Sequence, residues 1–202
     1  GEVTSYLGME LTRDKAQKTI HLSQEKYIHE LVNRFKEYES KPAATPLAVN
    51  HGLKVREPDE EEVPGQERFP ELLGGIMYLM VCTRPDIAHA VSVLSRYIAP
   101  GRHGHQHWKA ALRVLAYLKQ TAHYSLQLGG DSHVLEGHSD SSWADDPTDR
   151  RSSQGYCFNL GSGAISWKAT RSPAVALSSC EAELYAGTAA AQEAVWLSGL
   201  LA

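Results

Sequence analysis

The stretch Val175-Ala176-Leu177-Ser178-Ser179-Cys180-Glu181-Ala182-Glu183-Leu184 decides how the second half of this chain folds. It predicts the beginning of a helix, because Ser178 and Glu181 have the spacing of a capping box. Glu181 therefore has a structural role at the helix N-terminus, whereas Glu183 has none. With about 100° of rotation per residue, Glu183 points about 160° away from Glu181, so its presence calls for another explanation.

A second acidic residue, Asp140, lies in the segment 135–143, whose pattern predicts a strand. A strand aspartate that faces a helix glutamate is the first half of a two-metal nuclease site. The second half, another strand ending in Asp, is expected after the helix, and the sequence stops at Ala202 before reaching it. Two interpretations of Asp140 stay open: a metal ligand, or a residue that caps a bulge or turn before Trp143. Glu183, if it faces the sheet, needs a cation or a hydrogen-bond donor.

The rest of the chain shows helical periodicity first and strand alternation after Thr121, so we expect a domain boundary near 122–133. The patterns predict a hairpin at 6–23; a helix at 24–38 capped by Ser23; a connector at 39–68 whose acidic run 59–62 is a solvated loop; helices at 69–81, 87–97 and 105–120; strands at 124–128, 134–142, 154–160 and 164–169; and a closing helix from 178 or 179. The turn 161–163 makes the last two strands an antiparallel hairpin.

The net charge of −4 over 202 residues argues against a uniformly basic nucleic-acid binder. The charge is nevertheless uneven, because no Asp or Glu occurs between Asp86 and Asp131. Two interpretations of the basic residues in that stretch stay open: a solvated helix face, or contact with a phosphate backbone without base specificity. The candidate nucleic-acid-binding residues are Arg96, Arg102, Lys109, Arg113 and Lys119.

The three cysteines have no metal-ligand spacing, which favours a reduced, intracellular setting. No signal peptide and no apolar run of about 18 residues is present, so we expect no membrane association. The run His103-x-His105-x-His107 is a weak metal signal, because alternate histidines share a face only on a strand and this segment opens a helix. We expect instead a solvated, weakly basic helix entrance, and no small-molecule ligand.

Several short blocks, taken in order, resemble the Pol polyprotein of copia-type LTR retrotransposons, from the end of the reverse transcriptase into the RNase H domain. The resemblance covers essentially all 202 residues. The blocks are Tyr6-Leu7-Gly8-Met9-Glu10; Leu22-Ser23-Gln24 with Lys26-Tyr27-Ile28; Thr45-Pro46; Gly75-Ile76-Met77-Tyr78-Leu79; Thr83-Arg84-Pro85-Asp86-Ile87-Ala88; Leu94-Ser95-Arg96; the run 107–121; Arg151-Ser152 with Gly155-Tyr156; Ile165-Ser166-Trp167-Lys168; and Ala176-Leu177-Ser178-Ser179 with Glu181-Ala182-Glu183.

The resemblance implies an α+β fold, with a helical reverse transcriptase thumb and connection segment at 1–122 and the N-terminal half of an RNase H-like domain at 123–202. It implies that Asp140 and Glu183 match the first two metal-binding carboxylates of RNase H. The implied cofactor is Mg²⁺ or Mn²⁺, the implied substrate is an RNA–DNA hybrid, and the implied partner is the remainder of the Pol polyprotein. An active element would place the chain in a cytoplasmic virus-like particle or in the nucleus.

The chain departs from the family pattern in ways that bear on activity. The paired aspartates of the polymerase and the third RNase H aspartate are absent from the 202 residues, so we expect the isolated chain to be inactive. The family block Ser-Asp-Ala-Asp-Trp reads Ser139-Asp140-Ser141-Ser142-Trp143 here. The strand that pairs beside the Asp140 strand in the family is also missing. The alternative function is that of a non-catalytic, nucleic-acid-binding remnant of a decayed element.

Overall fold

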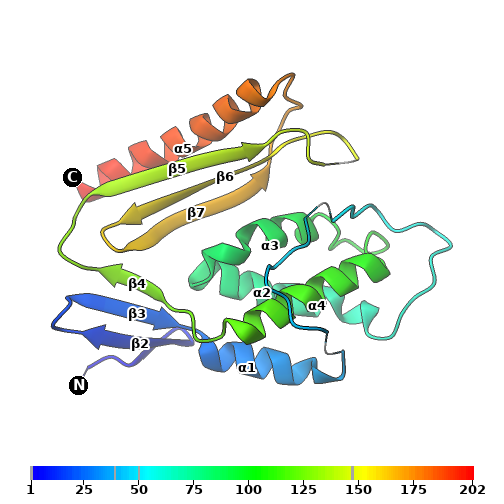
Figure 1. Ribbon diagram of the computed structural model, residues 1–202, viewed down its shortest axis with the longest axis horizontal. Coiled ribbons are helices and arrows are strands. Elements are labelled where there is room, and N and C mark those ends of the chain that lie inside the picture. Colours follow the sequence, from blue (N-terminus) through cyan, green and yellow to red (C-terminus); the bar gives the residue numbers. More distant parts are fainter. Residues whose placement is uncertain (1, 39, 50, 147) are drawn as a thin grey trace. The chain divides into compact units, whose positions relative to one another are not determined.

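The computed structural model describes residues 2–38, 40–49, 51–146 and 148–202, and it has the α+β composition that the sequence predicts (Figure 1). Two compact units are present. The first contains the residues up to Thr12 together with His21–Leu126, and the second contains Arg13–Ile20 together with Gln127–Ala202. No helix in the described ranges has both the length and the apolar character required to cross a membrane.

The N-terminal strands form the predicted hairpin and extend it on both sides. A four-stranded sheet has the order β1 (Ser5–Tyr6), β2 (Met9–Asp14), β3 (Thr19–Ser23) and β4 (Leu126–Gly129). The strand that alternation predicts at 124–128 therefore corresponds to β4, and its neighbour is β3.

Four helices and three short 3₁₀ turns follow the helical patterns of the sequence. They are α1 (Glu25–Arg34), η1 (Lys36–Tyr38), η2 (Gln66–Arg68), α2 (Phe69–Cys82), η3 (Pro85–Ile87), α3 (Ala88–Ser95) and α4 (His105–Gln120). The helix predicted at 24–38 was too long, because regular helix ends at Arg34 and continues as the 3₁₀ turn η1. The predicted cap was also misplaced by one residue: Gln24 is the N-cap, although the Ser23 hydroxyl accepts the Glu25 N–H at 3.2 Å.

The core of the first unit lies where helical periodicity places it. The predicted apolar stripe of α1 and its C-cap points inward, with Ile28, Leu31 and the C-cap residue Phe35 almost completely buried. The four helices contact one another pairwise, α2 with α3 and α4, and α4 with α1 and α3. Burial of a large apolar side chain contributes about 1.5–3 kcal/mol, so this cluster is the main source of stability in the unit. Its fully buried members also include Phe69, Leu72, Leu73, Ile76, Leu79, Ile87, Leu94, Val114 and Leu118.

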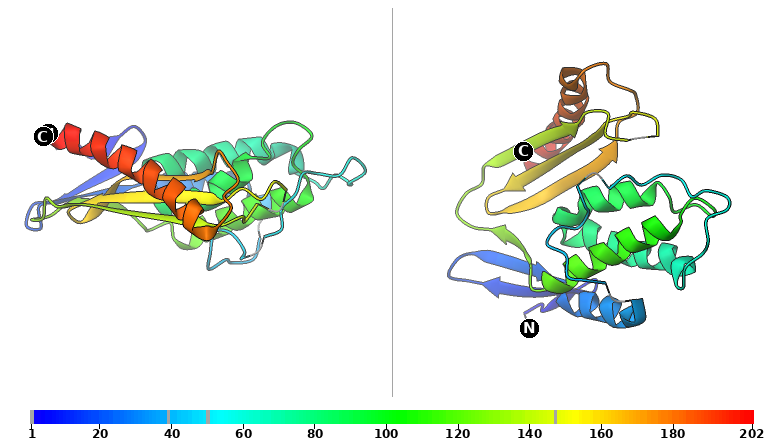
Figure 2. Two further views of the ribbon diagram at one scale, coloured as in Figure 1. Left: turned by 90° about the horizontal axis from the view of Figure 1, so that it is seen from above. Right: turned by 45° about the vertical axis from the view of Figure 1, so that its right-hand side comes forward.

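The second unit contains a three-stranded antiparallel sheet with one long helix packed on it. The sheet has the order β5 (Leu135–Ser142), β6 (Ser153–Leu160) and β7 (Gly163–Arg171), so β5 is an edge strand of this sheet. The predicted tight turn is confirmed between β6 and β7, where Gly161 has a φ of 65°. Helix α5 (Ser179–Leu201) packs along β5 and β6 (Figure 2).

The acidic run 59–62 is solvated only in part. Asp59, Glu61 and Glu62 are exposed, as predicted. Glu60 is an exception, because its carboxylate accepts the His105 N–H at 2.7 Å at the N-terminus of α4. A negative charge is stabilised at that end of a helix by the exposed N–H groups and the helix dipole. The prediction of a solvated loop was therefore wrong at Glu60, which anchors the connector to α4.

A buried guanidinium joins the ends of α2 and α4. Arg84, which is 2% exposed, donates two hydrogen bonds to the Asp86 carboxylate, at 2.9 and 2.7 Å. It also donates to the backbone oxygen of Thr121 at 3.0 Å and to the Thr121 hydroxyl at 2.6 Å. The Tyr117 hydroxyl donates to Asp86 at 2.8 Å, and the rings of Tyr117 and Tyr124 lie within 5.6 Å of the guanidinium carbon. The Asp86 carboxylate thus neutralises the charge of Arg84, and the two oxygens of Thr121 accept further N–H groups of the guanidinium.

The same contacts set the ionisation of Asp86. Burial alone would raise the pKa of this carboxyl, but the hydrogen bonds and the charge of Arg84, with the hydroxyl of Tyr117, outweigh burial and hold the pKa below its usual value. Asp86 is therefore ionised at neutral pH, as the pairing requires.

We predict that Arg84→Ala lowers the free energy of unfolding of the first unit by about 2–4 kcal/mol, because it empties a buried position and removes the hydrogen bonds to Thr121 and Asp86. The measurement is the urea midpoint followed by circular dichroism at 222 nm. Arg102→Ala, at an exposed arginine of the first unit, is the matched control and should change stability by less than about 0.5 kcal/mol. Equal midpoints for the two variants would contradict the role assigned to Arg84.

Candidate functional site

The N-terminus of α5 is built as the sequence predicts, with one difference. Ser178 is the N-cap and its hydroxyl accepts the Glu181 N–H at 3.1 Å. The Glu181 carboxylate accepts the N–H of Leu177 at 2.7 Å rather than that of Ser178. It also accepts the Tyr185 hydroxyl at 3.2 Å. Glu181 therefore holds the first turn of the helix through both carboxylate oxygens.

Glu183 turns toward the sheet, and its donor is a serine. The Ser141 hydroxyl donates to Glu183 Oε1 at 2.9 Å, while the Glu183 side chain stays exposed. Ser141 directly follows Asp140 in β5, and Asp140 is exposed as well. The structure thus brings the two predicted carboxylates to neighbouring positions at the same end of β5. They are connected through Ser141.

The strand pairing shows how Asp140 is oriented relative to α5. Ser141 is paired with Gln154, and Gln154 borders α5 in a small hollow that Ala186 also lines. Side chains of neighbouring strand residues point to opposite faces, so Asp140 is directed away from the face that Ser141 shares with α5. Asp140 and Glu183 therefore lie near each other in the fold, but their carboxylates do not face each other.

Asp140 and Glu183 provide the type of ligand that suits a magnesium or manganese ion, but two carboxylates are fewer than such an ion needs. Exposed carboxylate oxygens are the ligands that Mg²⁺ prefers, together with waters and phosphate oxygens. Within the described ranges, no group of three or more His, Cys, Asp or Glu side chains is placed to hold a metal ion. We therefore derive no catalytic step through a metal from these residues alone.

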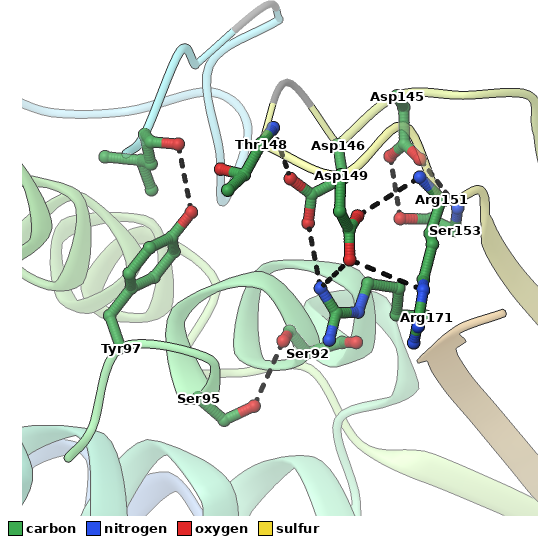
Figure 3. Close-up of polar contacts among 11 residues, drawn as sticks. Ser92, Ser95, Tyr97, Asp145, Asp146, Thr148, Asp149, Arg151, Ser153 and Arg171 are labelled. Atoms are coloured by element: carbon green, nitrogen blue, oxygen red, sulfur yellow. Dashed lines mark hydrogen bonds and ion pairs between the residues drawn. The ribbon is translucent and has the colours of Figure 1, made fainter. Parts of the chain in front are cut away.

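The loop after Trp143 is the predicted polar tip with local pairing to arginine (Figure 3). Asp145 accepts the Ser153 N–H at 2.6 Å and the Ser153 hydroxyl at 2.7 Å. Arg171, at the end of β7, donates to Asp149 at 2.7 Å and to Asp146 at 3.5 Å. Asp146 is only 4% exposed, so the loop is more tightly packed than a solvated tip. These acids serve the structure of the loop and leave no carboxylate pointing at Asp140 in the contacts described.

The five candidate nucleic-acid-binding residues do not form one row. Arg96 is the half-buried C-cap of α3, and Arg102 lies exposed in the turn before α4. On α4, Lys109 and Arg113 are four residues apart and share a face, because four residues rotate a helix by about 400°. Lys119, exposed in the last turn of α4, lies on a different side of the helix.

The two basic residues that share a face of α4 differ in their availability. Arg113 donates to the backbone oxygen of Thr45 at 3.1 Å and to the Thr45 hydroxyl at 2.9 Å. Its guanidinium is therefore bound by the connector, whose Thr45-Pro46 segment is close to Arg113 in space but not in the sequence. Lys109 is exposed, and it is the better placed of the two to meet a phosphate.

The histidine run at the start of α4 is solvated only in part. His107 is buried, and its Nδ1 accepts the Gly104 N–H at 2.9 Å, so the neutral ring carries its proton on Nε2. Burial lowers the pKa of His107 to about 4, although the nearby Glu60 acts in the opposite direction. His103 stacks on Phe69 with ring centres 4.8 Å apart. The prediction of a weakly basic, solvated entrance was therefore wrong for His107.

Sequence reasoning missed the residues that orient the candidate site. Ser141 was noted only as a departure from the family block, and no pattern indicated that it would bind Glu183. Arg171 was not selected, because it lies far along the chain from the aspartates it pairs with. The tripeptide Arg84-Pro85-Asp86 did signal a structural feature, but its spacing indicated a helix start and gave no sign of a buried ion pair.

Comparison with known proteins finds matches to polyproteins of transposons. The chain is 41% identical over 206 residues to the "Retrovirus-related Pol polyprotein from transposon TNT 1-94" of Nicotiana tabacum, covering 100% of this chain and 15% of that protein. It is 34% identical over 197 residues to the "Retrovirus-related Pol polyprotein from transposon RE2" of Arabidopsis thaliana, covering 97% of this chain and 13% of that protein. The chain thus spans only a small part of these two relatives.

A third relative has a different name and is matched over most of its own length. The chain is 47% identical over 127 residues to the "Secreted RxLR effector protein 161" of Plasmopara viticola, a match that covers 62% of this chain and 88% of that protein. No family model matches the chain, and no solved structure matches it.

We predict that His107 makes the first unit sensitive to mild acid. Because the pKa of His107 is lower in the folded chain than its ordinary value of 6.5, its contribution is complete above about pH 6.5 and is lost as the pH falls toward 4. The loss amounts to up to about 3 kcal/mol. Urea unfolding at pH 7 and pH 4.5 should show a smaller decrease for His107→Gln than for the unaltered chain. An identical decrease in both would show that His107 does not cause it.

Proposed function

The chain is homologous over its whole length to retrovirus-related Pol polyproteins from plant transposons, and we propose that it is the part of such a polyprotein in which a copia-type reverse transcriptase passes into its RNase H domain. In this proposal the helices of the first unit are the thumb and connection of the polymerase. Strands β5–β7 and α5 are the first elements of the RNase H domain. The proposed reaction of the complete protein is hydrolysis of the RNA strand of an RNA–DNA hybrid.

One observation carries this proposal: the hydrogen bond from Ser141 to Glu183, which holds the helix carboxylate beside the strand position of Asp140. The distance between these residues in the sequence is 42 positions, so their approach is a property of the fold. The proposal assigns Mg²⁺ or Mn²⁺ in the complete domain to Asp140 and Glu183, which requires the Asp140 side chain to turn from the opposite face of β5 toward Glu183. A bound divalent ion supplies activation of water and stabilisation of the leaving oxygen. Ser141 would position Glu183 by its hydrogen bond.

The basic residues of α4 supply the proposed contact with the hybrid. Lys109 is exposed and belongs to a stretch without acids from 87 to 130, so a phosphate meets no nearby negative side chain of that stretch. Phosphate contacts contribute affinity and orientation but carry no sequence information. This property suits an enzyme whose substrate is defined by its hybrid backbone.

A second function, that of a non-catalytic nucleic-acid-binding remnant, also has an observation in its favour. Among the described residues, no group of three or more His, Cys, Asp or Glu side chains could hold a metal ion. A relative that the match covers to 88% bears a name other than Pol polyprotein. The two functions differ in whether the pair Asp140 and Glu183 binds a divalent ion.

We predict weak binding of Mn²⁺ at this pair, measured as paramagnetic broadening of backbone amide signals. Titration should broaden the signals of 139–142 and 181–184 first, because these amides lie closest to the carboxylates. Asp140→Asn and Glu183→Gln should each reduce the broadening. Glu193→Gln is the matched control, since Glu193 also lies on α5 and accepts a serine hydroxyl of the sheet, that of Ser166 at 2.6 Å. Broadening that follows Glu193 as strongly as Glu183 would favour the remnant.

We also predict that the affinity for an RNA–DNA hybrid depends on salt and on Lys109 more than on Arg113. Lys109→Gln should reduce the slope of log affinity against log salt by about 0.9 for the one phosphate contact removed. Arg113→Gln should change the slope less, because its guanidinium is bound to Thr45. Fluorescence anisotropy with a labelled hybrid at several salt concentrations measures both slopes. An affinity that does not respond to salt would exclude phosphate tracking by this helix.

A further inference from the structure

Strand β5 lies at the edge of the three-stranded sheet, so one side of its backbone has no neighbouring strand among the described residues (Figure 1). Most residues of β5 are exposed, and the segment contains no Pro, Lys or Arg. Its pairing with β6 keeps one continuous register from Leu135 to Ser142. Edge strands are usually protected by such residues, by bulges or by a covering element. The edge of β5 is therefore open to another strand.

The pairing with β6 shows which backbone groups of β5 point to the open edge. The N–H of Gly161 donates to the backbone oxygen of Val134 at 3.3 Å, so the backbone of Val134 is bonded toward β6. In an antiparallel pair the hydrogen-bonded positions alternate along the strand. The even-numbered residues of β5 therefore direct their N–H and C=O groups toward β6. The odd-numbered residues direct theirs toward the open edge.

A second copy of β5 can pair with this edge only in a register that brings the outward groups of both strands together. A two-fold axis makes the pair antiparallel, and the axis must then pass through a residue. An axis at His138 would place Glu136 opposite Asp140, and an axis at Asp140 would place the two Asp140 carboxylates opposite each other. An axis at Gly137 would pair only residues 135–139. An axis at Ser139 pairs residues 136–142 and places each His138 opposite the partner's Asp140.

The axis at Ser139 also suits both faces of the sheet. Ser141 is on the α5 side, so His138 and Asp140 lie on the opposite face, where both are exposed. A histidine N–H that faces a carboxylate across antiparallel strands stabilises their pairing. On the α5 side the partner's Gly137 stands opposite Ser141. Since Gly137 has no side chain, the hydrogen bond from Ser141 to Glu183 is left undisturbed.

We propose that the open edge of β5 binds a second copy of this chain, antiparallel and with the two-fold axis at Ser139. The joined sheet contains the three strands of each copy, with the two β5 strands at its centre. Both α5 helices lie on one face of this sheet, and the paired His138 and Asp140 side chains lie on the other. The proposal concerns assembly and does not depend on the proposed nuclease function.

The first test is sedimentation velocity of the whole chain over a series of concentrations, where we expect an equilibrium of monomer and dimer. His138→Asp places a carboxylate opposite each partner's Asp140 and should weaken association about five- to thirtyfold. Adding Asp140→His to that variant restores the opposite pairs and should recover most of the affinity. His133→Asp is the matched control, because it makes the same change of charge at an exposed residue before β5 and should leave association unchanged.

The second test reads the register by oxidation of a chain that carries Cys180→Ser, which removes an exposed thiol. Ser139→Cys should form a disulfide between copies, because the Cα atoms of a hydrogen-bonded antiparallel pair are about 5.5 Å apart. Ser142→Cys, the matched control, should not, because it lies about 20 Å from its counterpart in this register. Both are measured on a non-reducing gel.

Three results would overturn the proposal. They are a chain that stays monomeric at every concentration, a dimer that His138→Asp does not weaken, and equal cross-linking through positions 139 and 142. The first result would leave the edge of β5 to a strand of a different protein or segment. If His138→Asp does not fold, the cysteine variants still decide the question, since serine and cysteine are similar in size.

Discussion

The burial of one positive charge, that of Arg84, is the constraint on which the helical part of this molecule depends. A guanidinium that is 2% exposed is tolerated only where its donors are paired. Here Asp86 follows two residues later, and Thr121 comes from the end of α4. Because Arg84 lies directly after α2, these bonds fix where α2 ends and how α4 meets it. The direction of α4 in turn determines where Lys109 is displayed. The helix also forms one wall of a 340 Å³ cavity, through Leu112 and Leu115.

The second unit is stabilised in a different way, and this difference affects the candidate site. Only Ala182, Ala186 and Leu197 are buried among the residues of α5. The small side chains of Ala182 and Ala186 allow the helix to lie close to β5 and β6. That closeness lets Glu183 reach Ser141, and further along the helix it lets Glu193 reach Ser166. Large apolar residues of α5, including Leu184, Val195 and Trp196, are exposed, so the helix contributes less burial than its composition allows.

Local patterns predicted the elements well, and long-range contacts were the part that escaped prediction. Helical periodicity located α2 and α4, and the spacing of Ser178 and Glu181 located the start of α5. Those signals are short-range, so they can be read from neighbouring residues. The burial of His107 and the binding of Glu60 at the start of α4 join segments some 45 residues apart. Asp140 and Glu183 were selected from the sequence, but only the fold shows that Ser141 connects them.

In the proposed function, α4 and the start of α5 each contact a nucleic-acid hybrid. The most direct measurement is photo-cross-linking with an RNA–DNA hybrid whose RNA strand carries 4-thiouridine, followed by mass spectrometry of the linked peptides. The account predicts linked peptides from α4 around Lys109, and from the segments around Asp140 or Glu183, which an unlabelled hybrid removes by competition. Cross-links that competition does not remove, or that lie outside both regions, would contradict it.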